Sequence, residues 1–468
     1  MKKIVIVGGG TAGLMAALIL KFRFQGLQVD LIKSSNNKIV GVGESSTEHW
    51  NDFMRFCLIK PEDIIKEAGA TLKFAVKFED WIDKDYFHSV SGLISNFKFG
   101  QYYSQYAHTI INDIKNEDYI CREVLDNKII EENLPNQFHF DTFKLNEFLI
   151  KKCKNQSINI IEDDLIDIDV ENNNIKKLKG NKKEYFYDFY IDCTGFKKLL
   201  ISKLGAKWIS YKEYLPLNEA IAFQTPDTDE YPLYTLSKKL KHGWLWRIPV
   251  QGRWGNGYVF DNTKINADQA KKECEQLLNM NIDIANNIKF EAGASDKAWI
   301  GNCVAMGLSS NFIEPLEASS IAMTIQQSFL LMHMLVNYSS KDIELYNKRF
   351  NSIVENIKDF VCLHYYYENK MPDSLLNKLD TWKHRLPIDE DFQGGYYIFN
   401  PHNFIILLKE YNLVNKDSIK KEYNLINLNL RNLTRKNYQS YKDYYLSDKK
   451  TGHKEFIQQI LDGKRVLY

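Results

Sequence analysis

The pattern of apolar residues at the start of the chain predicts a strand, a helix and a second strand. Lys3–Val7 is a short apolar run of the kind that forms a buried strand, and Leu14–Phe24 is helix-like. Gln28–Ile32 is a second short apolar run. A glycine-rich turn, Gly8–Gly13, joins the first strand to the helix. This order predicts a βαβ unit that opens a Rossmann-like α/β fold.

Apolar and polar residues alternate from Thr71 to Phe78, which predicts one half-buried strand. Lys73 and Lys77 fall on its less apolar face. From this pattern alone, both are expected to be solvated surface lysines. A further set of strands between Ala220 and Phe260 predicts an antiparallel sheet.

The pattern changes character in two places. Residues 82–135 are rich in aromatic residues and only weakly periodic, which favours an insertion that lines a substrate pocket. Residues 336–468 are mainly helical and charged in pattern. We therefore expect an α/β module over 1–335, which contains the insertion, and a helical C-terminal lobe over 336–468.

The composition is that of an ordinary soluble enzyme, with 44% apolar and 26% charged residues in a chain of 468. A net charge of +1 gives no electrostatic reason to bind nucleic acid or an anionic membrane. We find no run of 18 apolar residues and no secretory signal. The seven cysteines and ten histidines show no metal-binding spacing, so we expect a cytoplasmic protein without a metal.

The glycine turn has the Gly-x-Gly-x-x-Gly spacing of a dinucleotide fingerprint, between a strand and a helix. Such a turn lets backbone amides approach a pyrophosphate at the positive end of the helix. The residues expected to bind the cofactor here are Gly8, Gly10, Thr11, Ala12 and Gly13. The acidic residue expected about twenty positions later, to hold a ribose, is absent, and Lys33 and Ser34 stand there instead. Either the cofactor exchanges readily or another group contacts the ribose.

Two tryptophans occur two positions apart in Gly243–Pro249. On a strand, Trp244 and Trp246 would point to the same face. They are either two large core residues or a rigid apolar wall that separates a bound cofactor from a substrate.

Taken together, these motifs resemble those of flavin-dependent halogenases of the tryptophan-halogenase family. The similarity occurs in the family's order over roughly the first 370 residues and weakens after that. The matching segments are Gly8–Ala17, Gly41–Ser45, Thr71–Lys73, His139–Asp141, Asp192–Phe196, Gly243–Pro249, Asn311–Glu317 and Asp359–Tyr365. The tryptophan-containing segment is the most diagnostic, because ordinary flavin hydroxylases lack it.

The resemblance implies a mechanism that uses FAD, as FADH2, together with O2 and a halide ion. Reduced flavin reacts with O2 to give a C4a-hydroperoxide, and halide attack on it gives hypohalous acid. This acid reaches a lysine beside the aromatic substrate, a role that Lys73 inherits, with Lys77 as its competitor. Glu317 matches the second catalytic residue; we expect it in the first turn of a helix that opens at Pro315, where the helix dipole favours its ionised form.

The resemblance also assigns the remaining site residues. Backbone amides near Ser319 and Ser320 would bind the halide, and Trp244 and Trp246 would separate flavin from substrate. His364 is more readily interpreted as a structural histidine. Additional cofactor contacts would come from Lys33, Gly43, Glu44, Ser45, Gly307 and Leu308.

No second glycine-rich loop for NAD(P)H is evident, so we expect a separate flavin reductase to supply FADH2 by diffusion. The expected substrate is a small electron-rich aromatic molecule, such as an indole, phenol or pyrrole. The C-terminal region lacks the aromatic-plus-carboxylate clamp typical of free-tryptophan enzymes, so the sequence favours one of these molecules over free tryptophan. A homo-oligomer is compatible with the sequence. The alternatives are a flavin-dependent aromatic hydroxylase and a flavin-binding protein without turnover.

Overall fold

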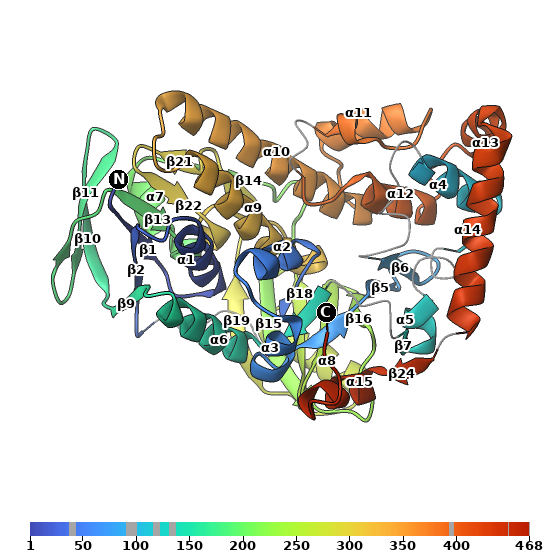
Figure 1. Cartoon of the computed structure of the whole chain (residues 1–468), viewed down its shortest axis with the longest axis horizontal. Coiled ribbons are helices and arrows are strands. Elements are labelled where there is room, and N and C mark those ends of the chain that lie inside the picture. Colours follow the sequence, from blue (N-terminus) through green and yellow to red (C-terminus); the bar gives the residue numbers. More distant parts are fainter. Residues whose placement is uncertain are drawn as a thin grey trace.

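A computed structural model describes residues 1–36, 44–89, 101–115, 122–130, 137–392, 397–447 and 449–467. Its first layer is a six-stranded sheet in the order β21-β22-β13-β1-β2-β9 (Figure 1). All neighbouring strands are parallel except β21, which is antiparallel to β22. The strands are β1 Lys3–Val7, β2 Gln28–Lys33, β9 Asn159–Glu162, β13 Phe189–Asp192, β21 Trp299–Ile300 and β22 Cys303–Ala305. This sheet confirms the predicted Rossmann-like α/β fold.

Alternate residues of β1 face two different apolar clusters. Ile4 and Ile6 pack with α1 (Thr11–Arg23), whose residues from Gly13 to Leu20 are all buried. Val5 and Val7 pack on the other face against a β-meander and α7 (Leu199–Lys203). The meander consists of β10 Leu165–Glu171, β11 Asn174–Gly180 and β12 Glu184–Tyr185. Because both faces are covered, the sheet is buried as parallel sheets require.

A seven-stranded sheet with the order β19-β15-β18-β17-β16-β5-β6 forms the second layer. Its strands pair antiparallel except β16 and β5, so the predicted antiparallel sheet is confirmed with one parallel pair. Leu245 faces α8 (Ala267–Leu278), whereas Trp244 faces the main core. The strands are β5 Ala75–Glu79, β6 Tyr86–Ser89, β15 Glu219–Pro226, β16 Tyr234–Leu240, β17 Gly243–Val250, β18 Arg253–Phe260 and β19 Ile284–Lys289.

The single strand predicted from Thr71 to Phe78 is wrong. The segment forms two strands, β4 (Thr71–Lys73) and β5, which belong to different sheets. β4 pairs with β8 (Gln137–Phe140), and β8 pairs with β3 (Glu44–Ser45). The strands separate at Phe74, whose N–H donates to the backbone oxygen of Leu233. Lys73 therefore leaves the alternation that governs Lys77, and it is buried rather than solvated.

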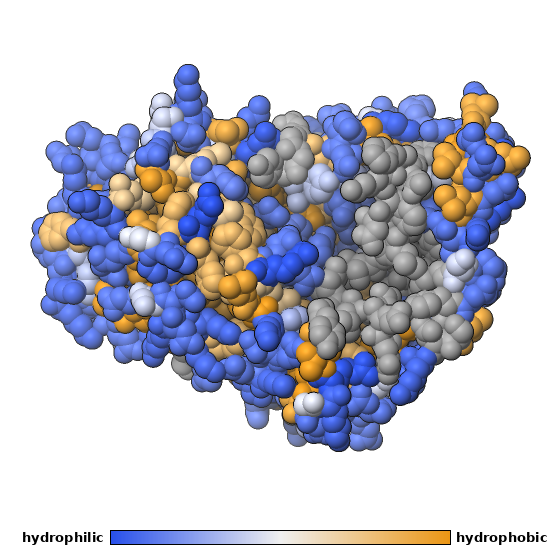
Figure 2. All heavy atoms as spheres, in the orientation of Figure 1, coloured by the Kyte–Doolittle hydropathy of each residue, from blue (hydrophilic) through white to orange (hydrophobic). Residues whose placement is uncertain are grey.

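Helices dominate the chain after residue 340, as predicted. They are α10 Ser340–His364, α11 Asp373–Trp382, α12 Pro401–Glu410, α13 Lys416–Leu425, α14 Leu428–Ser447 and α15 His453–Leu461. Exposed leucines of α13 and α14, among them Leu425 and Leu428, gather at one end of the molecule (Figure 2). None of the described helices combines the length and apolar character needed to cross a membrane.

The C-terminal segment returns to the N-terminal half of the chain (Figure 1). Its strand β24 (Lys450–Gly452) pairs with β7 (Lys128–Ile130). The ring of His453, at the start of α15, accepts a hydrogen bond from the N–H of Leu72 in β4 at 2.9 Å. The end of the chain therefore supports the strand that carries Lys73.

The remaining elements connect these layers. α6 (Thr142–Asn155) and α9 (Ser319–Met334) pack on α1. β14 Trp208–Ser210, β20 Gly293–Ser295 and β23 Asn311–Phe312 form a small sheet. Parts of the insertion predicted over residues 82–135 lie outside the described residues. The other helices are α2 His49–Phe56, α3 Pro61–Glu67, α4 Gln101–Ile111 and α5 Arg122–Asp126.

Candidate active site

The glycine fingerprint forms a tight turn that leaves the start of α1 open. Gly8 has φ +124°, and a Cβ there would lie 2.1 Å from the backbone oxygen of Cys193. A Cβ on Gly13 would lie 2.0 Å from the backbone oxygen of Gly8. By contrast, a Cβ on Gly10 would meet no described atom within 4 Å. The start of α1 has no side-chain cap and the space beside Gly10 is open, which fits the pyrophosphate of a dinucleotide.

A second turn borders the same helix start. Gly307 begins the 3-10 helix η3 (Gly307–Ser309) with φ +60°, and a Cβ there would lie 2.7 Å from that of Ala12. The hydroxyl of Ser309 donates to Asp192 at the end of β13, at 3.1 Å. The structure thus brings together the predicted cofactor contacts at Thr11, Ala12, Gly307 and Leu308.

The acidic residue missing after β2 has a counterpart on the neighbouring strand. Lys33 ends β2, and its ammonium pairs with Oε1 of Glu162, at the end of β9, at 3.0 Å. Hydrogen bonding to Lys33 lowers the pKa of Glu162. The carboxylate at this edge of the sheet thus comes from Glu162, which motif spacing along β2 could not reveal.

The predicted flavin strap is connected to the strand of Lys73. Gly43 lies outside the described residues, while Glu44 and Ser45 form β3. In β8, His139 pairs with Ser45 on one side and with Thr71 of β4 on the other. The end of the strap and Lys73 therefore belong to one small sheet.

Lys73 is a buried amine, with 1% of its surface exposed. Within the part of the chain that the structure describes, its Nζ donates to the backbone oxygen of Ser46 at 3.1 Å and forms no ion pair. Burial lowers the pKa of Lys73 to about 8, although the charges of Glu317 and Glu48 act to raise it. Near pH 8 both the ammonium and the neutral amine are present.

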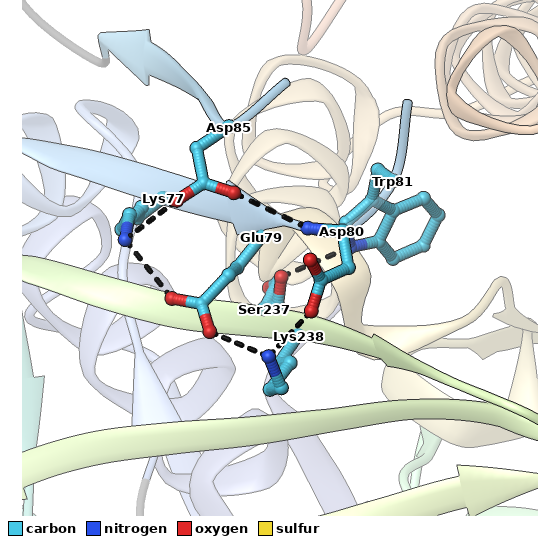
Figure 3. A network of polar contacts seen from close by, with 7 residues as sticks. All are labelled: Lys77, Glu79, Asp80, Trp81, Asp85, Ser237 and Lys238. Atoms are coloured by element: carbon cyan, nitrogen blue, oxygen red, sulfur yellow. Dashed lines mark hydrogen bonds and ion pairs between the residues drawn. The ribbon is translucent and has the colours of Figure 1, made fainter. Parts of the chain in front are cut away.

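Lys77 has the opposite surroundings, which Figure 3 shows. Its Nζ pairs with Glu79 Oε2 and Asp85 Oδ2, both at 2.9 Å, and 20% of its side chain is exposed. Burial acts to lower the pKa of Lys77, but hydrogen bonds with Glu79 and Asp85 outweigh it and raise the pKa. This ammonium is occupied by two carboxylates, so the competitor role considered from the sequence has no support in the geometry.

Glu317 is a second buried charged group, with 2% of its surface exposed. Its Oε1 lies 2.9 Å from Nδ1 of His88 and 3.0 Å from Nε2 of His364. Burial acts to raise the pKa of Glu317, but the two histidines outweigh it and lower the pKa to about 2. Glu317 is therefore ionised at neutral pH.

The predicted helix that opens at Pro315 is wrong. Pro315–Glu317 form a 3-10 turn, η4, and Ala318 follows with φ +54°, a left-handed conformation that breaks the helix before α9 begins at Ser319. Glu317 ends this short turn. Its ionised form is thus favoured by two imidazoles rather than by the dipole of a helix that starts at Pro315.

Trp244 and Trp246 share one face of β17, as predicted, with ring centroids 6.1 Å apart. The Trp246 ring covers Gly257, where a Cβ would lie 2.0 Å from a ring atom. The Trp244 indole N–H donates to Glu314 Oε2 at 3.2 Å, and the Tyr365 hydroxyl donates to the same oxygen at 2.6 Å. Burial raises the pKa of Glu314 to about 7. The tryptophan pair is thereby tied to the turn that carries Glu317.

Known proteins resemble this chain over most of its length. The family model described as tryptophan halogenase matches residues 3–421. A tryptophan 6-halogenase from Streptomyces toxytricini is 27% identical, over 87% of this chain and 88% of that protein. A tryptophan 7-halogenase from Lentzea aerocolonigenes is 27% identical, over 83% of each.

The chain belongs to the tryptophan halogenase family. Solved structures agree with its fold. A tryptophan halogenase from Shewanella frigidimarina NCIMB 400 superposes with a TM-score of 0.85 at 23% identity, over 99% of this chain and 98% of that one. A flavin-dependent halogenase from Xanthomonas campestris gives a TM-score of 0.82 at 25% identity, over 98% of each chain. The protein is thus a flavin-dependent halogenase with an FAD-binding fold, as the sequence predicts.

In this halogenase, α9 starts directly after the turn of Glu317. Ser319 is buried at the helix start and Ser320 is half-buried. Their backbone amides lie at the positive end of a helix that packs on α1 and η3. The candidate halide site thus follows Glu317 directly in the chain, on a helix that packs on the candidate cofactor turn at Gly307.

Sequence reasoning missed His88 and took His364 for a structural residue. His88 comes from β6, at the edge of the aromatic-rich segment, and the chain there carries no motif. His364 ends α10, and its ring also stacks on Phe78 at 4.4 Å. The described residues contain no group of three or more side chains suited to hold a metal.

Proposed function

We propose that this halogenase uses FADH2, O2 and a halide ion to halogenate an electron-rich aromatic ring, with Lys73 delivering the electrophilic halogen. The observation that carries this proposal is the burial of Lys73 without a paired carboxylate. A buried amine that stays unpaired costs folding free energy, and such costs concentrate at functional sites.

The glycine turn after β1 and the turn at Gly307 would hold the flavin. When bound, reduced flavin together with O2 supplies the oxidation that converts halide to hypohalous acid. The amides at Ser319 and Ser320 would bind the halide beforehand. Trp244 and Trp246 would keep the aromatic substrate apart from the cofactor, so that halogen rather than oxygen reaches the ring.

Lys73 would bind hypohalous acid through Nζ, either by hydrogen bonding as the ammonium or by forming a haloamine as the neutral amine. In the overall exchange, the ring carbon gains the halogen and loses its proton, and the oxygen of hypohalous acid leaves as water. Glu317, ionised at neutral pH, would stabilise the cationic ring and accept this proton. Both groups are buried, which excludes bulk water from the reacting atoms.

For the substrate, we propose a small molecule that contains an indole, and we include tryptophan itself although the sequence lacks the clamp typical of free-tryptophan enzymes. The relatives from Streptomyces toxytricini and Lentzea aerocolonigenes, named as tryptophan 6- and 7-halogenases, support an indole. We further propose that FADH2 arrives by diffusion from a separate flavin reductase.

The function is tested by product analysis. The protein is supplied with a generic flavin reductase, O2, and chloride, bromide or iodide in turn, and is assayed by mass spectrometry on tryptophan, indole, phenol and pyrrole. We expect a product whose isotope pattern follows the halide and which disappears without halide. An oxygen adduct independent of halide would identify a hydroxylase, and flavin binding without any product would indicate a protein without turnover.

A further inference from the structure

Two histidines hold the same oxygen of Glu317. His88 on β6 and His364 at the end of α10 both contact Oε1, at 2.9 and 3.0 Å. All three side chains are at most 2% exposed. Three elements that are distant in the sequence thus meet at one carboxylate oxygen.

The outer nitrogens of these rings show how each histidine is oriented. An ionised carboxylate only accepts hydrogen bonds, so Nδ1 of His88, which is hydrogen-bonded to Oε1 of Glu317, carries hydrogen. The amide of Asn403 on α12 donates to Nε2 of His88 at 3.0 Å, and the hydroxyl of Tyr86 is hydrogen-bonded to Nδ1 of His364 at 3.0 Å. His88 therefore donates to Glu317, whereas Nε2 of His364 contacts the same oxygen without the geometry of a hydrogen bond.

The carboxylate that they hold also acts on Lys73. Glu317 raises the pKa of Lys73 through its charge. Nevertheless, none of the ion pairs formed by the described residues joins these two side chains, and the ammonium of Lys73 instead donates to Ser46. Opposite charges in a dry interior attract strongly, so a restraint on one of these two side chains is needed to keep them apart.

We propose that His88 and His364 are positioning residues that restrain Glu317 and prevent it from closing an ion pair with Lys73. The amine of Lys73 thereby stays available to receive hypohalous acid, a role that rests on the proposed function. Glu317 keeps its negative charge for the aromatic ring. The restraint separates the two charged groups of the site without neutralising either.

Other charged and titratable groups also face this pair. Glu48 acts on Lys73, and the amide of Gln137 holds its carboxylate at 3.2 Å. His139 on β8 faces Lys73 and is neutral, because burial and the charge of Lys73 lower its pKa well below the usual value. Tyr86 completes the surroundings of Glu317. None of these groups is substituted in the variants of the following test.

The test compares variants that remove a donor with variants that keep it. His88→Leu removes the hydrogen bond from Nδ1 to Glu317, and His364→Leu removes the contact of Nε2 with the same oxygen. His88→Asn places an amide N–H where Nδ1 was, and His364→Gln places one where Nε2 was. The matched control is His242→Leu, which removes a histidine that lies 3.7 Å from Glu273, away from the site.

Two quantities are measured. The first is the rate of product formation with the best substrate of the panel. The second is the titration of Lys73 in the free enzyme, followed by NMR of protein labelled with ε-13C lysine and assigned by the loss of the signal in Lys73→Ala. A residue with a purely structural role would not move this titration in a folded variant.

We expect the leucine variants to lower the rate about 10-fold to 100-fold, as loss of one polar contact with a charged group predicts. The Lys73 titration should move to higher pH, because the released carboxylate pairs with the ammonium. His88→Asn, His364→Gln and His242→Leu should stay within about 3-fold of the native rate and keep its titration. An unchanged or lowered Lys73 titration in both leucine variants would overturn the proposal.

Asn403→Leu provides a second test in case His88→Leu or His364→Leu does not fold. It leaves His88 in place and removes the donor that fixes its ring, so we expect a smaller shift in the same direction; a Lys73 titration that stays at the native value would count against the restraint. If the native enzyme makes no halogenated product, the proposed function fails, while the titration of the free enzyme still tests the restraint.

Discussion

Lys73 and Lys77 are four residues apart in the sequence, yet their surroundings shift the pKa of the amine in opposite directions. Lys73 on β4 is buried, donates to a backbone oxygen, and has its pKa lowered to about 8. Lys77 on β5 lies in the network of Figure 3, paired with Glu79 and Asp85, and has its pKa raised. Burial without a carboxylate partner lowers the pKa of an amine and makes it reactive, whereas pairing with carboxylates keeps it a cation.

The carboxylates near the two lysines differ in the same way. Glu79 pairs with both Lys77 and Lys238, and so belongs to a structural network at the sheet edge. Glu317 pairs with neither lysine and is held by histidines instead. The comparison indicates that the two groups proposed to be catalytic are kept apart from each other, while the charged groups around Lys77 are joined in ion pairs.

The largest expected difference between the two regions is in turnover, when the carboxylate of each region is replaced. Glu317→Gln should lower the turnover number about 100-fold or more, because it removes the charge that stabilises the ring and accepts its proton. Glu79→Gln should change turnover less than about 2-fold, since a partly exposed ion pair contributes little. Steady-state kinetics of both variants provides the check. Equal losses in the two variants would contradict the distinction.

Stability should respond to Lys73 in an unusual direction. In the unfolded chain this amine has a pKa near 10.5, and in the folded protein it has one of about 8. Keeping the buried amine protonated therefore costs about 3 kcal/mol of folding free energy below pH 8. Between pH 8 and 10.5 the folded protein releases the proton first, so the free energy of unfolding of the native enzyme rises with pH.

Lys73→Met should accordingly be more stable than the native enzyme at pH 7, by up to this amount. The difference should shrink as the pH approaches 10.5. Urea unfolding at pH 7, 9 and 10.5 measures it. A variant that is less stable than the native enzyme at pH 7 would show that the buried amine is not under strain.

A smaller effect is expected from the second carboxylate that acts on Lys73. Glu48 raises the pKa of this amine, so Glu48→Gln should move the Lys73 titration from about 8 to lower pH. Asp85→Asn, which removes a partner of Lys77, should leave the Lys73 titration unchanged. NMR of ε-13C lysine distinguishes the two. A Lys73 titration that shifts in Asp85→Asn instead would show that the surroundings of Lys73 and Lys77 are electrostatically coupled.

The smallest expected effect is that of Lys77 on stability. Lys77→Ala should lower the free energy of unfolding by about 1 kcal/mol or less, and by less still at high salt, as partly exposed ion pairs do. Unfolding at two salt concentrations measures this. A loss of several kcal/mol that does not depend on salt would mean that Lys77 is a core residue.

Features that depend on neighbouring residues could be predicted from the sequence. The βαβ unit and the glycine turn follow from local periodicity and spacing, and the shared face of Trp244 and Trp246 follows from strand geometry. The family's motifs pointed to Lys73 and Glu317, although the strand pattern alone placed Lys73 at the surface.

What the sequence could not reveal depends on contacts between distant segments. An alternating pattern does not mark the residue at which a strand leaves one sheet for another, so the separation at Phe74 was missed. His88 meets Glu317 across 229 residues, and no spacing rule covers such a pair. Glu162 supplies the acidic group at the β2 edge from a separate strand.

The most direct test of the central claim is the fate of the oxidised halogen in Lys73→Ala and Lys77→Ala. Both variants receive the same FADH2, O2, bromide and substrate, and halogenated product and free hypohalous acid are measured together, with flavin binding as a check on the fold. We predict that Lys73→Ala binds flavin and releases hypohalous acid without making product, whereas Lys77→Ala makes product like the native enzyme. Product from Lys73→Ala at the native rate would contradict the account.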